Sequence, residues 1–139
     1  MIPMKRYVLL GEDDEDDVAF FKEVFSPRYP HVNIVHFDNG REILHFLRNC
    51  PEDALPDFLL LDHLMPMMSA TDVLNALQKE PKFEKMVKAV WSTLILPVDW
   101  DRCLATGCNY YFDKPVSKTE WHALAAAVGS YFELKATGS

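Results

Sequence analysis

Five polar residues stand at the ends of apolar runs in the sequence, and their types could act together. Glu12 and Asp13 follow the first run, Asp62 and Ser92 close the third and fourth, and Lys114 follows the fifth. Carboxylates held within several ångströms of one another repel one another, which raises their pKa values. A divalent cation bound between them removes that repulsion. Hard oxygen ligands that are few and partly hydrated suit Mg²⁺, with Mn²⁺ as a substitute and with waters and a backbone carbonyl completing the shell.

A lysine and a hydroxyl beside such an ion indicate that a phosphoryl group completes the site. The metal and the ammonium would share the charge of its three equatorial oxygens, while the hydroxyl of Ser92 donates to one of them. A carboxylate oxygen bound to the metal would then attack phosphorus in line. The product of this chemistry would be an aspartyl phosphate.

These residues can meet only if the runs are neighbouring strands of one sheet. Strand and helix patterns alternate along the whole chain without a linker or repeat, which predicts an α/β fold of the (βα)₅ type with helices on both faces of a parallel sheet. Sites in such sheets lie beyond the carboxyl ends of the strands. The third run is apolar throughout and favours the central strand. The predicted strands are Tyr7–Leu10, His31–Phe37, Pro56–Asp62, Met86–Ser92 and Tyr110–Phe112.

Capping residues and helical periodicity predict five helices between and after these strands. The acids Glu15, Asp16 and Asp17 are interpreted as the negative start of the first helix, which the helix dipole favours. The first predicted helix spans about Glu15–Phe25, the second is capped by Asp38, and the third is capped by Ser69 or Thr71 and closed by Pro81. The fourth spans about Val98–Ala105 and stops at Gly107. The fifth begins with a Ser117–Glu120 capping box and fades toward Tyr131.

Length and composition indicate one domain and argue against nucleic acid or a membrane bilayer as a partner. The 139 residues suit one domain, and the net charge of −7 is local, because without the acids Glu12–Asp17 only 15 acidic residues face 14 basic ones. No basic stripe exists for nucleic acid. The longest apolar run, Ala123–Val128, is too short to span a bilayer. Three cysteines without metal-type spacing favour a reducing compartment, so we expect a cytoplasmic protein.

Several motifs together resemble the receiver domain of bacterial two-component response regulators, over about Lys5–Phe132. They are Val8-Leu-Leu-Gly-Glu-Asp-Asp, Asn39-Gly-Arg-Glu, Pro56-Asp-Phe-Leu-Leu-Leu-Asp-His-Leu-Met-Pro66, Val90-Trp-Ser-Thr and Tyr111-Phe-Asp-Lys-Pro115. The resemblance implies a flavodoxin-like, doubly wound sheet of five parallel strands in the order 2-1-3-4-5. It also implies an N-terminal lead at residues 1–4, a receiver domain at 5–132 and a tail at 133–139, of which the end from Lys135 is expected to fray.

The same resemblance implies a role for each site residue. Asp62 would accept a phosphoryl group from a phosphohistidine on a sensor histidine kinase or a histidine phosphotransfer protein. The Mg²⁺ ligands would be Glu12, Asp13, Asp62 and the backbone carbonyl of Leu64. Lys114 would pair with the phosphate, and Ser92 would bond a phosphoryl oxygen. Tyr111 would be the switch aromatic that fills the space Ser92 vacates, changing the face built by the fourth helix, fifth strand and fifth helix.

Three positions depart from the family pattern without removing a chemical group. Gly11 replaces an apolar residue and is expected to loosen the end of the first strand. Ser69-Ala70 stands where Asp-Gly or Asn-Gly is frequent, and Thr93 replaces a small residue and could narrow access to the phosphoryl pocket. These differences bear on kinetics more than on competence.

The expected function is therefore a phosphorylation-dependent switch in a two-component system or phosphorelay. With barely a dozen residues after Val128, we expect a stand-alone receiver that acts through a downstream protein and catalyses its own phosphorylation and dephosphorylation, without being a conventional enzyme. Whether it forms a homodimer stays open. An alternative is a receiver-like interaction module that is never phosphorylated. A metal-dependent hydrolase is disfavoured, because the chain lacks a second acid/base pair and a cap over the substrate.

Overall fold

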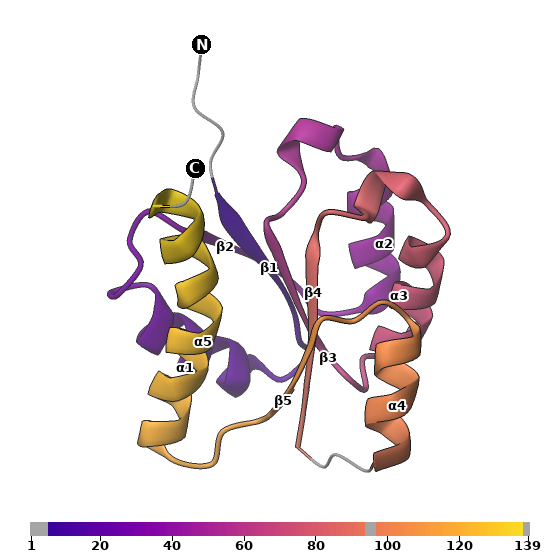
Figure 1. Ribbon diagram of the computed structural model, residues 1–139. Helices are drawn as coiled ribbons and strands as arrows, with labels where there is room; N and C mark the ends of the chain where they lie inside the picture. Colours follow the sequence, from indigo (N-terminus) through magenta and orange to yellow (C-terminus); the bar gives the residue numbers. More distant parts are fainter. Residues whose placement is uncertain (1–5, 94–96, 138–139) are drawn as a thin grey trace.

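A parallel sheet forms the middle layer of the protein (Figure 1). The computed structural model describes residues 6–93 and 97–137, without the side chains of 134–137, so the expected lead at residues 1–4 and the last two residues of the tail lie outside the described residues. The strand order is β2-β1-β3-β4-β5, as predicted. The strands are β1 (Tyr7–Gly11), β2 (Asn33–Phe37), β3 (Phe58–Asp62), β4 (Val87–Ser92) and β5 (Tyr110–Asp113).

Helices cover both faces of this sheet. Figure 1 shows α1 and α5 on one side and α2, α3 and α4 on the other. The helices are α1 (Glu15–Phe25), α2 (Gly40–Asn49), α3 (Ala70–Gln78), α4 (Pro97–Ala105) and α5 (Lys118–Thr137), with single 3₁₀ turns η1 (Glu52–Ala54) and η2 (Pro81–Phe83). No described helix is both long and apolar enough to cross a membrane.

Alternate residues of the strands supply two separate cores, because side chains of a strand point to opposite faces in turn. Val8 and Leu10 of β1 belong to the buried cluster under α1 and α5, whereas Leu9 belongs to the cluster under α2 and α3. All five residues of β3 are buried, as expected of the central strand. The sheet is thus held from both sides, which fixes the positions of its strand ends.

The helix starts near the site follow local capping. Asp14 caps α1 by accepting the backbone N–H of Asp16 at 2.9 Å, and Ser69, rather than Thr71, caps α3 in a capping box with Asp72. The prediction that Asp38 caps α2 was wrong. Asn39 does so, accepting the N–H of Glu42 at 2.9 Å, because α2 begins at Gly40 and only the residue directly before it is within reach.

Other element ends also differ from the predictions. The start of β2 is Asn33 instead of His31, because Tyr29 and Val32 close a turn with a 3.0 Å backbone hydrogen bond. The last helix does not fade near Tyr131, nor does it fray from Lys135, but continues to Thr137. Phe132 is buried there and its ring contacts Phe25 of α1, so packing prolongs the helix. The predicted stop of α4 is confirmed, with Gly107 at φ +83°.

Candidate functional site

The carboxyl ends of the strands bring the predicted residues to one edge of the sheet, toward the lower part of Figure 1. β1 pairs with β3, β3 with β4, and β4 with β5, all in parallel. Residues that follow β1 and close β3 and β4 therefore become neighbours although they lie far apart in sequence. The backbone N–H of Lys114 donates to the carbonyl of Ser92 at 2.8 Å, which fixes the chain that leaves β5.

Three carboxylates gather at this edge. Glu12, Asp13 and Asp62 each offer one oxygen, and these oxygens all lie within 4.8 Å of one another. Glu12 is completely buried, Asp62 is buried and Asp13 is exposed. The Glu12 backbone is held by Phe37 of β2, whose carbonyl accepts its N–H at 3.0 Å. The grouping is the only described set of three or more acids, histidines or cysteines placed to share a metal ion.

Lys114 supplies the positive charge of the site. Its Nζ lies 2.7 Å from Oε1 of Glu12 and 3.3 Å from Oδ1 of Asp62. A third acid, Asp17 of α1, accepts a hydrogen bond from the same ammonium at 2.9 Å. Sequence reasoning missed Asp17, because the run of six acids favours a solvated helix start for each of its later members.

Burial and mutual charge shift the protonation equilibria of these groups. Burial raises the pKa of Glu12 to about 7 against the opposing effect of Lys114, and the Asp62 charge adds to the rise. The pKa of Asp62 is also raised, by burial first, with Lys114 acting in the opposite direction. Burial alone would lower the pKa of Lys114, but its close contacts with the carboxylates of Glu12 and Asp17 outweigh burial and hold that pKa above its ordinary value.

Hard oxygen donors in this arrangement fit a divalent cation of the Mg²⁺ or Mn²⁺ type. Oε1 of Glu12 is buried without a donor in hydrogen-bond geometry, although the Lys114 ammonium is close to it. An oxygen of this kind is suited to a metal ion. The acidic cluster is therefore compatible with Mg²⁺.

A cavity of about 370 Å³ opens beside these groups. Its lining residues come from the ends of β3, β4 and β5 and from the start of α4: Asp62, His63, Leu64, Ser92, Thr93, Asp99 and Lys114. Leu64 exposes 73% of its surface here, and Ser92 is buried at the end of β4. The cavity thus gives a small anion access to Asp62, and Thr93 stands in its wall as expected.

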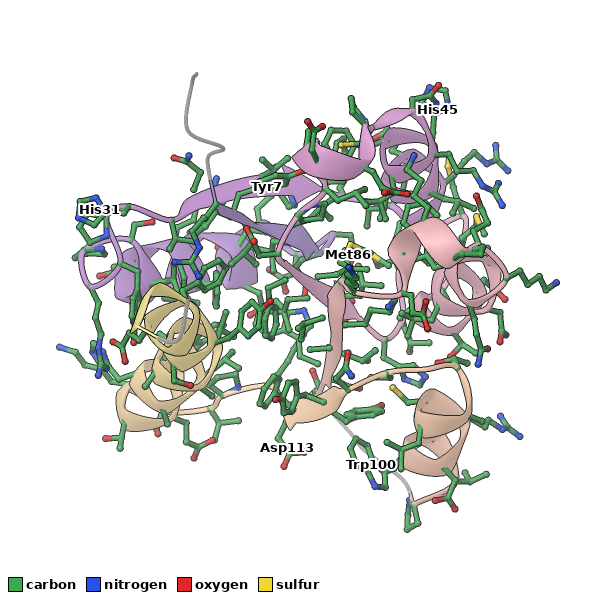
Figure 2. All side chains as sticks on the ribbon, turned by 45° about the horizontal axis from the view of Figure 1, so that its top comes forward. Tyr7, His31, His45, Met86, Trp100 and Asp113 are labelled. Atoms are coloured by element: carbon green, nitrogen blue, oxygen red, sulfur yellow. The ribbon has the colours of Figure 1, made fainter. Side chains whose placement is uncertain are left out.

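Tyr111 lies behind this cavity with its ring turned inward. It is half-buried, its hydroxyl is buried, and its ring centroid is 5.4 Å from that of Trp100 and 6.2 Å from that of His63. Figure 2 shows Trp100 projecting from α4 toward β5. Burial raises the pKa of Tyr111, and a hydrogen bond with Ser92 partly offsets that rise. Tyr111 and Ser92 are therefore adjacent, as a switch would require.

The unusual residues near the site have clear local consequences. Gly11 does not loosen β1, because it remains paired with both β2 and β3 and is buried. A Cβ at position 11 would lie 2.7 Å from Cδ1 of Ile43 and 2.9 Å from Cδ2 of Leu61. The side chains of these two residues therefore occupy the space that a side chain at position 11 would need. After β3, the chain returns through Met67, at φ +69°, to the Ser69 cap of α3. The turn is ordered without Asp-Gly or Asn-Gly.

No histidine belongs to the described cluster of Glu12, Asp13 and Asp62. Figure 2 shows His31 and His45 at opposite outer edges of the molecule. His36 of β2 contacts the site only through the backbone, with Nε2 2.7 Å from the carbonyl of Glu12. His63 lies in the cavity wall beside Tyr111.

Comparison with solved structures identifies the fold. The phosphorylated cyanobacterial phytochrome response regulator RcpA superimposes with a TM-score of 0.82 at 22% identity, covering 96% of each chain. The chain has the receiver fold of response regulators. The Mn²⁺-bound response regulator Rcp1 shares this receiver fold, with a TM-score of 0.80 and 20% identity over 91% of this chain and 94% of the other.

The sequence comparison finds a sensor histidine kinase and two-component response regulators. The sensor histidine kinase CheAY of Helicobacter pylori is 28% identical over 80% of this chain, which spans only 13% of the kinase. The two-component response regulator ORR11 of Oryza sativa is 24% identical over 88% of this chain and 80% of its own length. No family model matches the chain.

Proposed function

We propose that this receiver is a phosphorylation-dependent switch in which Asp62 accepts a phosphoryl group from a phosphohistidine. The P–N bond of the donor breaks, a P–O bond to an Asp62 carboxylate oxygen forms, and the released imidazole nitrogen regains its lone pair. The observation that carries the proposal is the Lys114 ammonium, 3.3 Å from Asp62 at the mouth of a cavity open to a small anion.

Each surrounding group has a separate task in this proposal. The ligands of Mg²⁺ or Mn²⁺ would be Glu12, Asp13, Asp62 and the backbone carbonyl of Leu64. The bound metal would offset the negative charge of the phosphoryl oxygens and help to align the donor in line with Asp62. Lys114 pairs with one phosphoryl oxygen and thereby offsets the charge that Asp62 gains. Ser92 donates its hydroxyl to another. The chain itself excludes bulk water from Glu12, which is fully buried.

The signal would leave the site through Ser92 and Tyr111. Because the two side chains are adjacent, any movement of the Ser92 hydroxyl toward a phosphoryl oxygen would change the surroundings of the Tyr111 hydroxyl. Tyr111 in turn contacts Trp100, so the change reaches α4 directly. The face of α4, β5 and α5 would then present a different surface to a downstream protein. The upstream partner would be a sensor histidine kinase or phosphotransfer protein in the cytoplasm.

Acetyl phosphate and beryllofluoride test this proposal without a known kinase. We expect the Mg²⁺-loaded protein to gain the mass of one phosphoryl group from acetyl phosphate and to change tryptophan fluorescence with beryllofluoride. Asp62→Asn should abolish both responses. Asp113→Asn is the matched control, because Asp113 is exposed and lies outside the acidic cluster. If Asp62→Asn keeps the adduct, Asp62 is not the acceptor.

A receiver-like interaction module that is never phosphorylated is the second candidate. One observation favours it, because the ion pairs of Lys114 with three acids already neutralise part of the site without any added cation. In that case millimolar Mg²⁺ would leave the tryptophan fluorescence unchanged, and acetyl phosphate would leave the mass unchanged. A Mg²⁺ titration of the wild-type protein therefore separates the two functions.

A further inference from the structure

Asp17 is the third partner of Lys114 and comes from a different part of the fold than the other two. Its Oδ2 accepts a hydrogen bond from Nζ of Lys114 at 2.9 Å, and the two side chains are only 21% and 11% exposed. The residues are 97 positions apart in sequence, so the contact ties α1 to the chain that follows β5. A half-buried ion pair of this kind is more strongly fixed than one at the surface.

The start of α1 leaves Asp17 free to make this contact. Asp14 caps the helix, so Asp17 occupies the third helical position, from which an acid ordinarily reaches back to the backbone N–H of the cap. That N–H already donates to Oε2 of Glu12 at 3.1 Å. Because Glu12 performs the task of the capping acid, the carboxylate of Asp17 turns to Lys114 instead.

Asp17 also differs from the other two partners of Lys114 in where it stands. Glu12 and Asp62 belong to the group of carboxylates that could hold a cation, whereas Asp17 does not. A cation bound by Glu12 and Asp62 would neutralise part of their negative charge and so weaken their attraction for Lys114. Asp17 is the one partner whose full charge would remain available to the ammonium.

We propose that Asp17 is a positioning residue that holds the Lys114 ammonium toward Asp62 for the incoming phosphoryl group. An ammonium has three N–H donors. Asp17 accepts one of them, and the same nitrogen lies 2.7 Å from Glu12 and 3.3 Å from Asp62, so a donor on the side of Asp62 can pass to a phosphoryl oxygen. This inference rests on the proposed function, because it assigns Asp17 a part in the same phosphoryl transfer.

The competing explanation is that Asp17 acts only through its charge at the helix start. Asp16 provides the matched control, since it lies in the same turn, carries the same charge and is not among the acids that contact Lys114. The two explanations predict opposite signs. Each Asn variant removes one negative charge, and by charge alone this should strengthen the binding of an anion. If Asp17 also holds Lys114 in place, Asp17→Asn should instead weaken anion binding, because Lys114 is released.

The experiment is a beryllofluoride titration in saturating Mg²⁺, followed by tryptophan fluorescence. Trp91 is a suitable reporter, because its ring lies 5.2 Å from Nζ of Lys114. We expect Asp17→Asn to weaken beryllofluoride binding about tenfold, the effect of losing one well-placed charged contact. Asp16→Asn should leave it unchanged or slightly tighter, and Asp17→Glu should restore part of the loss. Mg²⁺ affinity should change little in either Asn variant.

The outcomes separate this inference from the proposed function. If the wild-type protein does not respond to beryllofluoride, the proposed function fails and takes the role of Asp17 with it. If the wild-type protein responds while Asp17→Asn behaves as Asp16→Asn does, only the role of Asp17 is overturned. Equal loss of Mg²⁺ and beryllofluoride binding in Asp17→Asn would also overturn it, because that result indicates general damage to the site. Thermal unfolding of each variant verifies that it is folded.

Discussion

Nζ of Lys114 lies 2.7 Å from Oε1 of Glu12, a glutamate side chain with no exposed surface. A buried carboxylate is costly unless it is paired, and here the partner is a lysine that also faces Asp62 and Asp17. The internal cation therefore stabilises the acids before any divalent ion binds. The same lysine faces two of the acids that would hold such an ion.

The raised pKa of Glu12 makes stability depend on pH in a definite direction. The folded protein holds a proton on Glu12 up to about pH 7, whereas the unfolded chain releases it near pH 4.5. The contribution of Glu12 to stability is therefore full below pH 4.5 and is lost as pH rises through 7. Asp62 acts in the same direction, since its pKa is also raised. Lys114 stays protonated throughout this range.

Glu12→Gln tests this prediction, because glutamine keeps the shape and cannot ionise. In metal-free buffer, the wild-type protein should lose up to about 3 kcal/mol relative to Glu12→Gln between pH 5 and 8, at about 1.4 kcal/mol for each unit of pKa shift. Urea unfolding at several pH values measures the difference. Saturating Mg²⁺ should remove most of it from the wild type. Parallel stability curves for the two proteins would contradict a raised pKa for Glu12.

Thr93 lies in the wall of the cavity at Asp62, so we expect its side chain to narrow access to that carboxylate. Thr93→Ala removes a methyl and a hydroxyl without touching a proposed ligand, so acetyl phosphate should phosphorylate the variant severalfold faster. The Mg²⁺ affinity should stay the same. Thr71→Ala in α3, away from the cavity, is the control for a general effect of the substitution. An unchanged rate in Thr93→Ala would mean that Thr93 does not narrow the pocket.

Trp100 and Tyr111 should be energetically coupled, because their rings meet edge to face at 5.4 Å. A double-mutant cycle with Trp100→Leu and Tyr111→Leu is expected to give about 0.5–1.5 kcal/mol of coupling in urea unfolding. Tyr110 is the matched control, since its ring stacks on Phe58 and Phe112 instead. A cycle of Trp100→Leu with Tyr110→Leu should give a value near zero. Equal values in the two cycles would show that Trp100 is not specifically coupled to Tyr111.

The fold followed from the sequence wherever local signals and burial agreed. The run Phe58–Leu61 is apolar throughout and lies in the fully buried central strand. The first helix was predicted with its observed bounds, Glu15–Phe25. Ends of elements were predicted less well. Asn39 caps α2 instead of Asp38, because α2 begins at Gly40. Helix α5 continues past Tyr131, because the buried Phe132 packs against Phe25 of α1.

The sequence by itself determined which groups could do chemistry at the edge of the sheet. Glu12, Asp13, Asp62 and Lys114 follow or close strands, and parallel strands must bring such residues to one edge. Only the tertiary structure decided that Asp17 leaves the helix start to bind Lys114, and that Trp100 covers Tyr111. Both contacts depend on how far α1 and α4 lie from the sheet, a distance set by packing in the two cores and not by spacing along the chain.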